Sequence, residues 1–334
     1  QQDNPLPGLS NLDTTNPCGE VPLLAYESCN LGSVNLARML VRRRGSLHVD
    51  WEKLAAVVAL GVRFLDNVIE VNHYTSPLIQ NMTRANRKIG LGVMGWAEML
   101  IQMEVPYKSL EAVRLAGEVM HFIQQVSLET SVVLARERGV FSNWRHSKYF
   151  RQQIPLRNAT LNSIAPTGTI SIIADTPPSI EPLYALAFRR EHVLGEETLH
   201  EVNREVLRYL KDRHLYDLQI MEQIQQRGSV QHLSTLPSLV KNLLRTSLEI
   251  PYRYHLKHQQ AFQRFTDNAV SKTINLPAVS RVEDVAQIFY LAWKLGLKGV
   301  TVYRDGSRTK QVLSSFASGV NHREEPLSHC RPCV

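Results

Sequence analysis

NPCGEVPLLAYESCNLGSVNL, residues 16–36, is the most informative segment of this chain. It places the thiol of Cys18 between the amide of Asn16 and the carboxylate of Glu20, on a turn that proline and glycine stiffen. A second cysteine, Cys29, follows within the same segment. A single cysteine is usually a small buried apolar residue, but a thiol flanked by an amide and a carboxylate on a rigid turn indicates chemistry carried by a loop.

The rest of the sequence predicts an α/β architecture, because helical periods alternate with short apolar strands. Residues 51–71 are apolar nearly all round, which predicts a helix packed on more than one side. A second helix is predicted to begin at Ser76-Pro77, and a third to cover residues 111–138 and end at Gly139. A fourth is predicted to run from a capping box at residues 280–283 to about Leu295. Strands are predicted within residues 160–174, interrupted at Pro166-Thr167-Gly168, and at residues 299–303.

Residues 16–36 resemble the finger loop and following strand of class II ribonucleotide reductases, which depend on adenosylcobalamin. This resemblance implies that Cys18 forms a thiyl radical, that Glu20 handles the proton of the substrate's 3′-hydroxyl, and that Asn16 hydrogen-bonds the sugar. Chemically, a sulfur radical can exchange hydrogen with a carbon–hydrogen bond while a nearby carboxylate acts as general base. Val21 departs from the glutamine that is more frequent in the family, which we expect to alter local hydrogen bonding only.

The same resemblance assigns roles to two further segments. Cys29 matches one half of the dithiol that reduces the nucleotide, and its partner is expected upstream of this chain. Residues 165–171, APTGTIS, resemble the family's phosphate loop, in which backbone N–H groups of Thr167, Gly168, Thr169 and Ile170 face the substrate's phosphates. Pro177-Pro178-Ser179 departs from the family's turn of small residues and leaves the loop shape open.

The resemblance covers roughly residues 10–315 and continues through residues 266–277 and 302–308. Class I reductases carry two adjacent tyrosines in that last segment to receive a radical from another subunit, whereas here Val302 precedes Tyr303. The sequence therefore favours adenosylcobalamin as the cofactor and a radical made on site. The expected reaction is the reduction of ribonucleoside di- or triphosphates to deoxyribonucleotides for DNA synthesis.

The fold implied by the resemblance is the second half of a ten-stranded α/β barrel with a central finger loop that carries the radical cysteine. Residues 1–36 would be the finger loop and first strand, residues 37–312 the helices and strands of the half-barrel, and residues 313–334 a flexible tail. On this basis we expect a fragment, or one piece of a split enzyme, that needs an upstream half. The expected partners are that half, the nucleotide substrate and a thioredoxin-like reductant, with homodimer formation left open.

Two other functions compete with this interpretation. The first is a non-catalytic nucleotide-binding or assembly module that keeps the loop without the chemistry. Residues 90–95, GLGVMG, also satisfy the dinucleotide fingerprint of NAD-dependent dehydrogenases. That fingerprint requires a strand ending just before Gly90, and the preceding residues 83–88 are polar.

The tail ends in Cys330-Arg331-Pro332-Cys333, a spacing typical of redox pairs and of zinc half-sites. We favour a swinging dithiol that reduces the active-site disulfide again. Zinc held with His322 or His329 and a tail without a role are the alternatives. No metal is expected among the catalytic residues.

Composition limits the remaining possibilities. The 334 residues are 43% hydrophobic and 21% charged, which is typical of a globular protein, and no apolar stretch is long enough to span a membrane. The net charge of +7 is scattered among acidic residues, so we expect no nucleic-acid surface, although a basic field suits polyphosphate ligands. Four unevenly spaced cysteines indicate reactive thiols in a reducing compartment, the cytoplasm.

Overall fold

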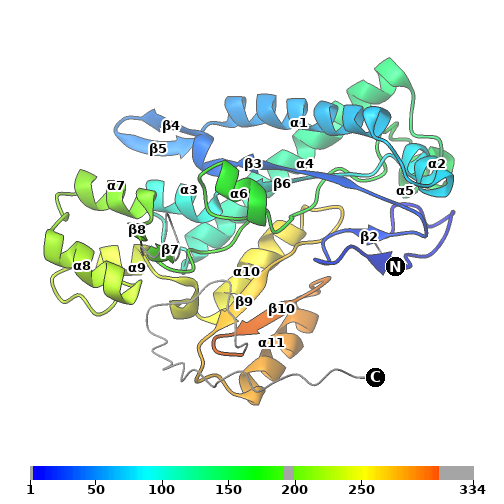
Figure 1. Cartoon of the computed structure of the whole chain (residues 1–334). Helices are drawn as coiled ribbons and strands as arrows, with labels where there is room; N and C mark the ends of the chain where they lie inside the picture. Colours follow the sequence, from blue (N-terminus) through cyan, green and yellow to red (C-terminus); the bar gives the residue numbers. More distant parts are fainter. Residues whose placement is uncertain (1–2, 191–198, 308–334) are drawn as a thin grey trace, which may run out of the picture.

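The computed structural model describes residues 3–190 and 199–307, and its centre is a row of parallel extended segments (Figure 1). The row begins with β3 (Asn30–Asn35), which pairs in parallel with β6 (Ile89–Met94). Parallel bridges then join Leu91 to Asn162 and Ile164 to Val270. The last of these segments leads into β9 (Thr273–Leu276), which pairs in parallel with β10 (Thr301–Arg304). The order across the row is therefore β3, β6, residues 160–164, residues 268–276 and β10.

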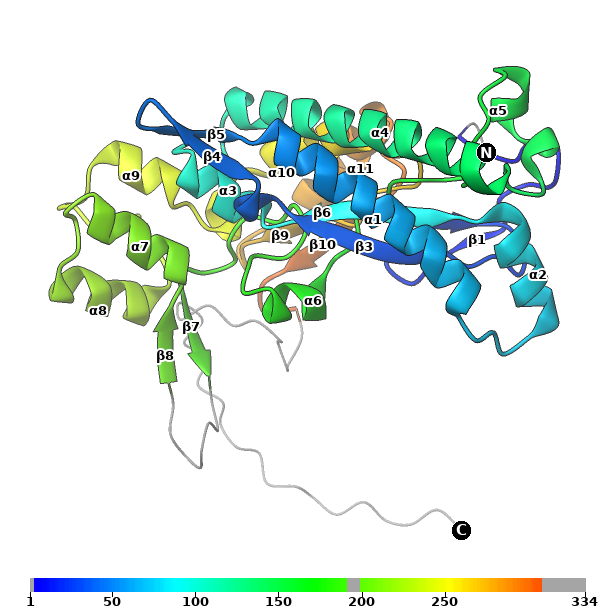
Figure 2. The same cartoon turned by 90° about the horizontal axis from the view of Figure 1, so that it is seen from above.

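Helices connect the successive segments of this row, as expected for an α/β protein. α1 and α4 lie side by side along β3 and β6 in both views, and α10 packs against α4 and β9 (Figures 1 and 2). The helices are α1 (Trp51–Val71), α2 (Pro77–Asn86), α3 (Trp96–Gln102), α4 (Leu110–Arg138), α5 (Lys148–Arg151), α6 (Gly168–Ile173), α7 (Arg204–Asp212), α8 (Leu218–Arg227), α9 (Ser238–Leu243), α10 (Tyr252–Gln263) and α11 (Val282–Lys294).

Three antiparallel hairpins lie outside the row. β1 (Thr14–Thr15) pairs with β2 (Pro22–Leu23), β4 (Leu40–Arg43) with β5 (Ser46–Val49), and β7 (Ala187–Arg190) with β8 (Leu199–Val202). Short 3₁₀ helices occur at η1 (Leu36–Arg38), η2 (Trp144–His146) and η3 (Ser247–Glu249). No described helix is both long and apolar enough to cross a membrane.

Helices α1, α2 and α4 have ends where the sequence predicts them. Asp50 caps α1 through Lys53 N, Ser76 caps α2 through Leu78 N, and α4 ends at Gly139.

The prediction that α1 is packed on more than one side is wrong for the described residues. Its buried side chains form one face, whereas Leu60, Phe64 and Val71 are exposed.

The prediction for residues 160–174 is half right. Residues 160–164 are extended and hydrogen-bonded to β6, through Ile89 N to Thr160 O and Leu91 N to Leu161 O. After Pro166, however, the chain forms α6 rather than a second strand, so Ile170, Ile172 and Ile173 belong to a helix that exposes them. Apolar residues in so short a run cannot distinguish a strand from a helix turn, which explains the error.

The dehydrogenase interpretation of GLGVMG is wrong. Gly90 and Gly92 lie inside the fully buried strand β6, not in a turn between a strand and a helix. A Cβ atom on Gly92 would lie 2.1 Å from the backbone oxygen of Ser163, and one on Gly90 would lie 2.7 Å from the Ser163 Cβ. These glycines therefore allow β6 and residues 160–164 to approach closely.

The capping box before α11 is shifted by one residue from its predicted position. Arg281 is the N-cap residue, and its backbone N–H donates to the Asp284 carboxylate at 2.9 Å. α11 still ends at Lys294, and β10 covers residues close to those predicted as the last strand.

Candidate active site

The loop that carries Cys18 is the tip of the β1–β2 hairpin. Asn16 closes this loop: its side-chain oxygen accepts from Val21 N at 3.0 Å, and its backbone oxygen accepts from Gly19 N at 3.0 Å. Gly19 has a φ of 81°, which favours glycine. The Cys18 thiol is consequently exposed at the end of a hydrogen-bonded turn. We refer to residues 16–21 as the Cys18 loop.

Glu20 anchors the Cys18 loop to the parallel row. Its backbone oxygen accepts from Ala269 N and from Ser163 Oγ, both at 2.8 Å. Glu20 is only 2% exposed, and its Oε2 has no hydrogen-bond partner among the described residues. A buried carboxylate oxygen without a donor is costly, so the position is suited to a ligand that brings a hydroxyl.

Cys29 immediately precedes β3, and its thiol contacts the Asn30 backbone oxygen at 3.6 Å. The pKa of Cys29 is raised to about 12: burial raises it most, Lys88 lowers it, and Glu27 and Glu20 raise it. Burial, followed by the charge of Glu20, also raises the pKa of Cys18. The charge of Glu20 thus acts on both thiols, so three of the predicted catalytic residues share one site.

Sequence reasoning missed a buried ion pair beside these residues. Lys88 Nζ contacts Glu27 Oε2 at 2.5 Å, and both side chains are 0% exposed. Glu27 also accepts from Leu24 N at 2.7 Å, and Lys88 donates to Pro22 O at 3.2 Å. The polar run before β6 gave a weak signal for Lys88, but nothing in the sequence shows that Glu27 is its partner.

The predicted phosphate loop lies at the carboxyl end of residues 160–164 and at the start of α6. Thr167 has a φ of 56°, unusual for a β-branched residue, and its Oγ1 accepts from Ser179 N at 2.7 Å. Gly168 begins α6, and a Cβ atom there would meet nothing within 4 Å. The space beside the first turn of α6 is therefore open.

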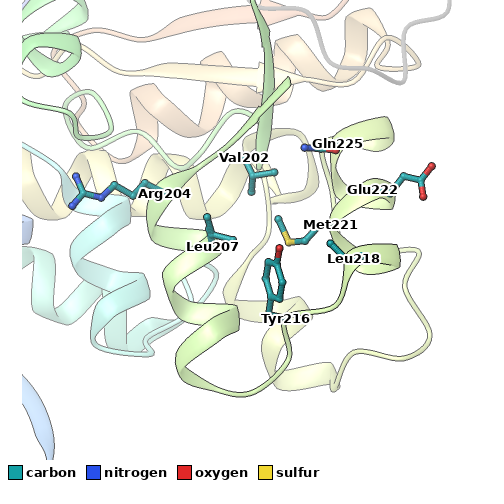
Figure 3. A pocket seen from close by; sticks show the side chains of 8 residues that line it. All are labelled: Val202, Arg204, Leu207, Tyr216, Leu218, Met221, Glu222 and Gln225. Atoms are coloured by element: carbon teal, nitrogen blue, oxygen red, sulfur yellow. The ribbon is translucent and has the colours of Figure 1, made fainter. Parts of the chain in front are cut away.

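A separate hollow of about 540 Å³ lies between α7, α8 and the end of β8 (Figure 3). Tyr216 and Met221 face its interior, together with Leu207, while Arg204 and Glu222 lie at its sides (Figure 3). Both overall views place α7 and α8 at the opposite end of the molecule from β1 and β2 (Figures 1 and 2). None of the predicted site residues lines this hollow.

The predicted redox pair Cys330 and Cys333 lies outside the described residues, as do His322 and His329. Among residues 3–190 and 199–307, no cluster of three or more His, Cys, Asp or Glu side chains is arranged to hold a metal.

Comparison with known families gives one match over most of the chain. The family described as "Ribonucleotide reductase, barrel domain" matches residues 2–303. A "Vitamin B12-dependent ribonucleoside-diphosphate reductase" of Mycobacterium tuberculosis is 51% identical over 94% of this chain. A protein of the same name from Thermoplasma acidophilum is 44% identical over 96% of the chain.

The chain spans less than half the length of these relatives, 44% of the first and 41% of the second. The "Ribonucleoside-diphosphate reductase subunit alpha" of Chlamydia pneumoniae is more distant, at 29% identity over 90% of the chain. Among solved structures, the "Actinobacillus ureae class Id ribonucleotide reductase alpha subunit" superimposes with a TM-score of 0.72 at 26% identity, covering 87% of this chain and 53% of that one.

Proposed function

Because the chain belongs to the ribonucleotide reductase barrel-domain family, we propose that it is the catalytic half of an adenosylcobalamin-dependent ribonucleoside-diphosphate reductase. Identity of 51% to a B12-dependent reductase, against 29% to an alpha subunit, supports this subclass. The replacement of a tyrosine pair by Val302-Tyr303 supports it independently.

The observation that carries the proposal is the pairing of an exposed thiol with a buried carboxylate on one loop. Cys18 is open to a reactant, whereas Glu20 Oε2 is buried without a partner among the described residues. A substrate sugar placed over the loop would present a carbon–hydrogen bond to the sulfur and a hydroxyl to the carboxylate. The site is thus suited to radical abstraction coupled to deprotonation.

In the proposed reaction, the Cys18 sulfur radical takes a hydrogen atom from the sugar and becomes a thiol. Glu20 accepts the proton of the adjacent hydroxyl. The side-chain oxygen of Asn16 is engaged by Val21 N, so Asn16 would address the sugar through its Nδ2 amide group. Cys29, with a partner thiol from the upstream half, would provide the two electrons: the pair is oxidised to a disulfide, the sugar hydroxyl that is lost leaves as water, and Cys18 returns its hydrogen atom to the sugar.

The exposure of Cys18 is compatible with adenosylcobalamin, since a bulky cofactor needs open access to the thiol. When bound, this cofactor supplies the radical that removes the hydrogen atom from Cys18. Cys18 is the residue of this chain that would face it, and the proposal names no other cobalamin contact among the described residues.

We propose a ribonucleoside diphosphate as the substrate, bound by the turn at Thr167, Gly168, Thr169 and Ile170. The first N–H groups of a helix have no partner within the helix and attract anions. The open space beside Gly168 and the strained backbone of Thr167 support this placement. The relatives are named as ribonucleoside-diphosphate reductases, which favours the diphosphate over the triphosphate as substrate.

The row of parallel segments from β3 to β10 supports a half-barrel, which a second row from the upstream half would close around the Cys18 loop. Within the described residues, β3 and β10 each pair on one side only, as open edges would.

A thioredoxin-like reductant and residence in the cytoplasm complete the proposal. Cys18 and Cys29 are both free thiols, and thiols stay reduced in the cytoplasm.

The decisive experiment mixes this chain with the upstream half of the same reductase and measures deoxynucleotide formation with and without adenosylcobalamin. We expect turnover only with the cofactor, and none from Cys18→Ser, because an oxygen–hydrogen bond is too strong for the radical exchange. Cys18→Ser should keep nucleotide affinity within a few-fold, since the phosphate contacts lie elsewhere. Nucleotide binding without turnover in the wild-type mixture would instead favour the non-catalytic assembly module.

A further inference from the structure

The strand register places Cys29 beside a buried cation. Asn30 and Ile89 are paired at the start of β3 and β6, so Cys29 and Lys88 occupy matching positions one residue earlier. Neighbouring strands lie about 4.8 Å apart, which brings the two backbones close together. Lys88 is 0% exposed, and it is not one of the site residues predicted from the sequence.

Four polar contacts hold the Lys88 and Glu27 side chains in place. Lys88 Nζ donates to Glu27 Oε2 and to Pro22 O, while Glu27 also accepts from Leu24 N and from Asn86 Nδ2. Pro22 belongs to β2, the strand that follows the Cys18 loop. The ammonium is therefore held between β2, which follows the Cys18 loop, and Glu27 in the segment that leads through Cys29 into β3.

A buried pair of this kind is rarely explained by stability. Removing two charges from water is costly, and an apolar pair of the same volume is often as stable. A cation held at a thiol has a chemical consequence, because it favours the thiolate, which is the nucleophilic form of cysteine.

We propose that Lys88 is a positioning residue for Cys29: held by Glu27 and Pro22, its ammonium keeps a positive charge at the thiol and promotes the thiolate. Three titratable groups from the elements around Cys29 act on it, namely Lys88, Glu27 and Glu20. Lys88 alone of these three favours the charged thiol, against burial and the two carboxylates. Its part in turnover rests on the proposed function, whereas its effect on thiol reactivity does not.

The test compares two variants of the full chain, Glu27→Gln and the double variant Lys88→Met/Glu27→Gln. Glu27→Gln leaves Lys88 with two neutral acceptors, the glutamine amide oxygen and Pro22 O, and the double variant removes the ammonium as well. The two variants therefore share glutamine at residue 27 and differ in the charge at residue 88. The rate of iodoacetamide alkylation at Cys29 is measured by peptide mass spectrometry between pH 7 and pH 10, after circular dichroism shows that each variant is folded.

We expect Cys29 to react about threefold to tenfold more slowly in the double variant than in Glu27→Gln, because a pKa rise of one unit lowers the thiolate fraction tenfold. Cys18 in the same molecules is the internal control, and its rate should differ little between the two variants. General loosening of the fold would accelerate alkylation, so a slower rate reports the lost charge.

Equal Cys29 rates in the two variants would overturn the proposal, and so would a change of the same factor at Cys18. Because neither measurement requires cofactor, substrate or upstream half, failure here is distinguishable from failure of the proposed reductase activity.

Discussion

Ser163 donates a hydrogen bond of 2.8 Å from its Oγ to the backbone oxygen of Glu20, 143 residues earlier in the chain. Ser163 is also the residue against which Gly92 of β6 packs. One serine therefore connects the Cys18 loop to a close approach between two segments of the parallel row. The first prediction tests that approach.

Gly92→Ala should destabilise the chain by about 1–3 kcal/mol or more, the usual cost of overpacking a core. Its Cβ would lie 2.1 Å from the Ser163 backbone oxygen, which has no room to move within the row. The matched control is Gly117→Ala in α4, where the nearest atom is 3.9 Å away and alanine favours the helix. Thermal unfolding that ranks the two variants equally would contradict the packing argument.

Glu20→Gln should lower kcat of the reconstituted reductase by about 10²–10⁴, the usual contribution of general acid–base catalysis. Nucleotide affinity should be largely retained, because the amide keeps the shape of the carboxylate. Steady-state kinetics separate these effects. A change in KM with kcat intact would mean that Glu20 binds substrate and is not the base.

The same Glu20→Gln variant should alkylate faster at Cys18 at neutral pH, without any cofactor. The charge of Glu20 raises the pKa of Cys18, so removing that charge lowers the pKa and increases the thiolate fraction. Burial is the larger cause and remains, so we expect about a two- to fivefold increase, in line with the roughly 0.2–1 kcal/mol of exposed charge pairs. Glu222→Gln, in the exposed part of α8, should leave the Cys18 rate unchanged.

Gly168→Val should weaken nucleotide binding. The backbone can accommodate the side chain, because a Cβ atom at residue 168 meets nothing within 4 Å. The valine would occupy the space beside the first N–H groups of α6, where the phosphates are proposed to bind. Gly299→Val, at another open and exposed glycine, is the control, and equal affinities for the two variants in equilibrium binding would move the phosphate site elsewhere.

If Cys330 and Cys333 shuttle electrons, changing both to serine should spare the first turnover and stop later ones with thioredoxin as reductant. A small dithiol that reaches the site directly should restore cycling, since thiol–disulfide exchange requires only access and a thiolate. Continued cycling with thioredoxin would exclude the shuttle. Loss of bound zinc and of stability, without rescue by the dithiol, would identify a structural metal site instead.

The local parts of the fold could be predicted from sequence because their signals are local. Asp50, Ser76 and Gly139 mark the ends of helices through caps that act within four residues. The errors arise where a short apolar run allows two structures. Ile170, Ile172 and Ile173 suit a strand equally well, but in the structure they follow the turn at Thr167, which accepts a hydrogen bond from Ser179 N, and belong to α6.

Sequence by itself determined the family, the α/β class and the residues of the Cys18 loop, because a motif that places a thiol, an amide and a carboxylate on one turn needs no distant partner. Only the tertiary structure decided what surrounds that loop. The contact of Ser163 with Glu20 joins residues 143 positions apart, and the contact of Lys88 with the buried Glu27 joins residues 61 positions apart. Such pairs depend on strand register and burial, which arise when distant segments pack together and leave no periodic trace in the chain.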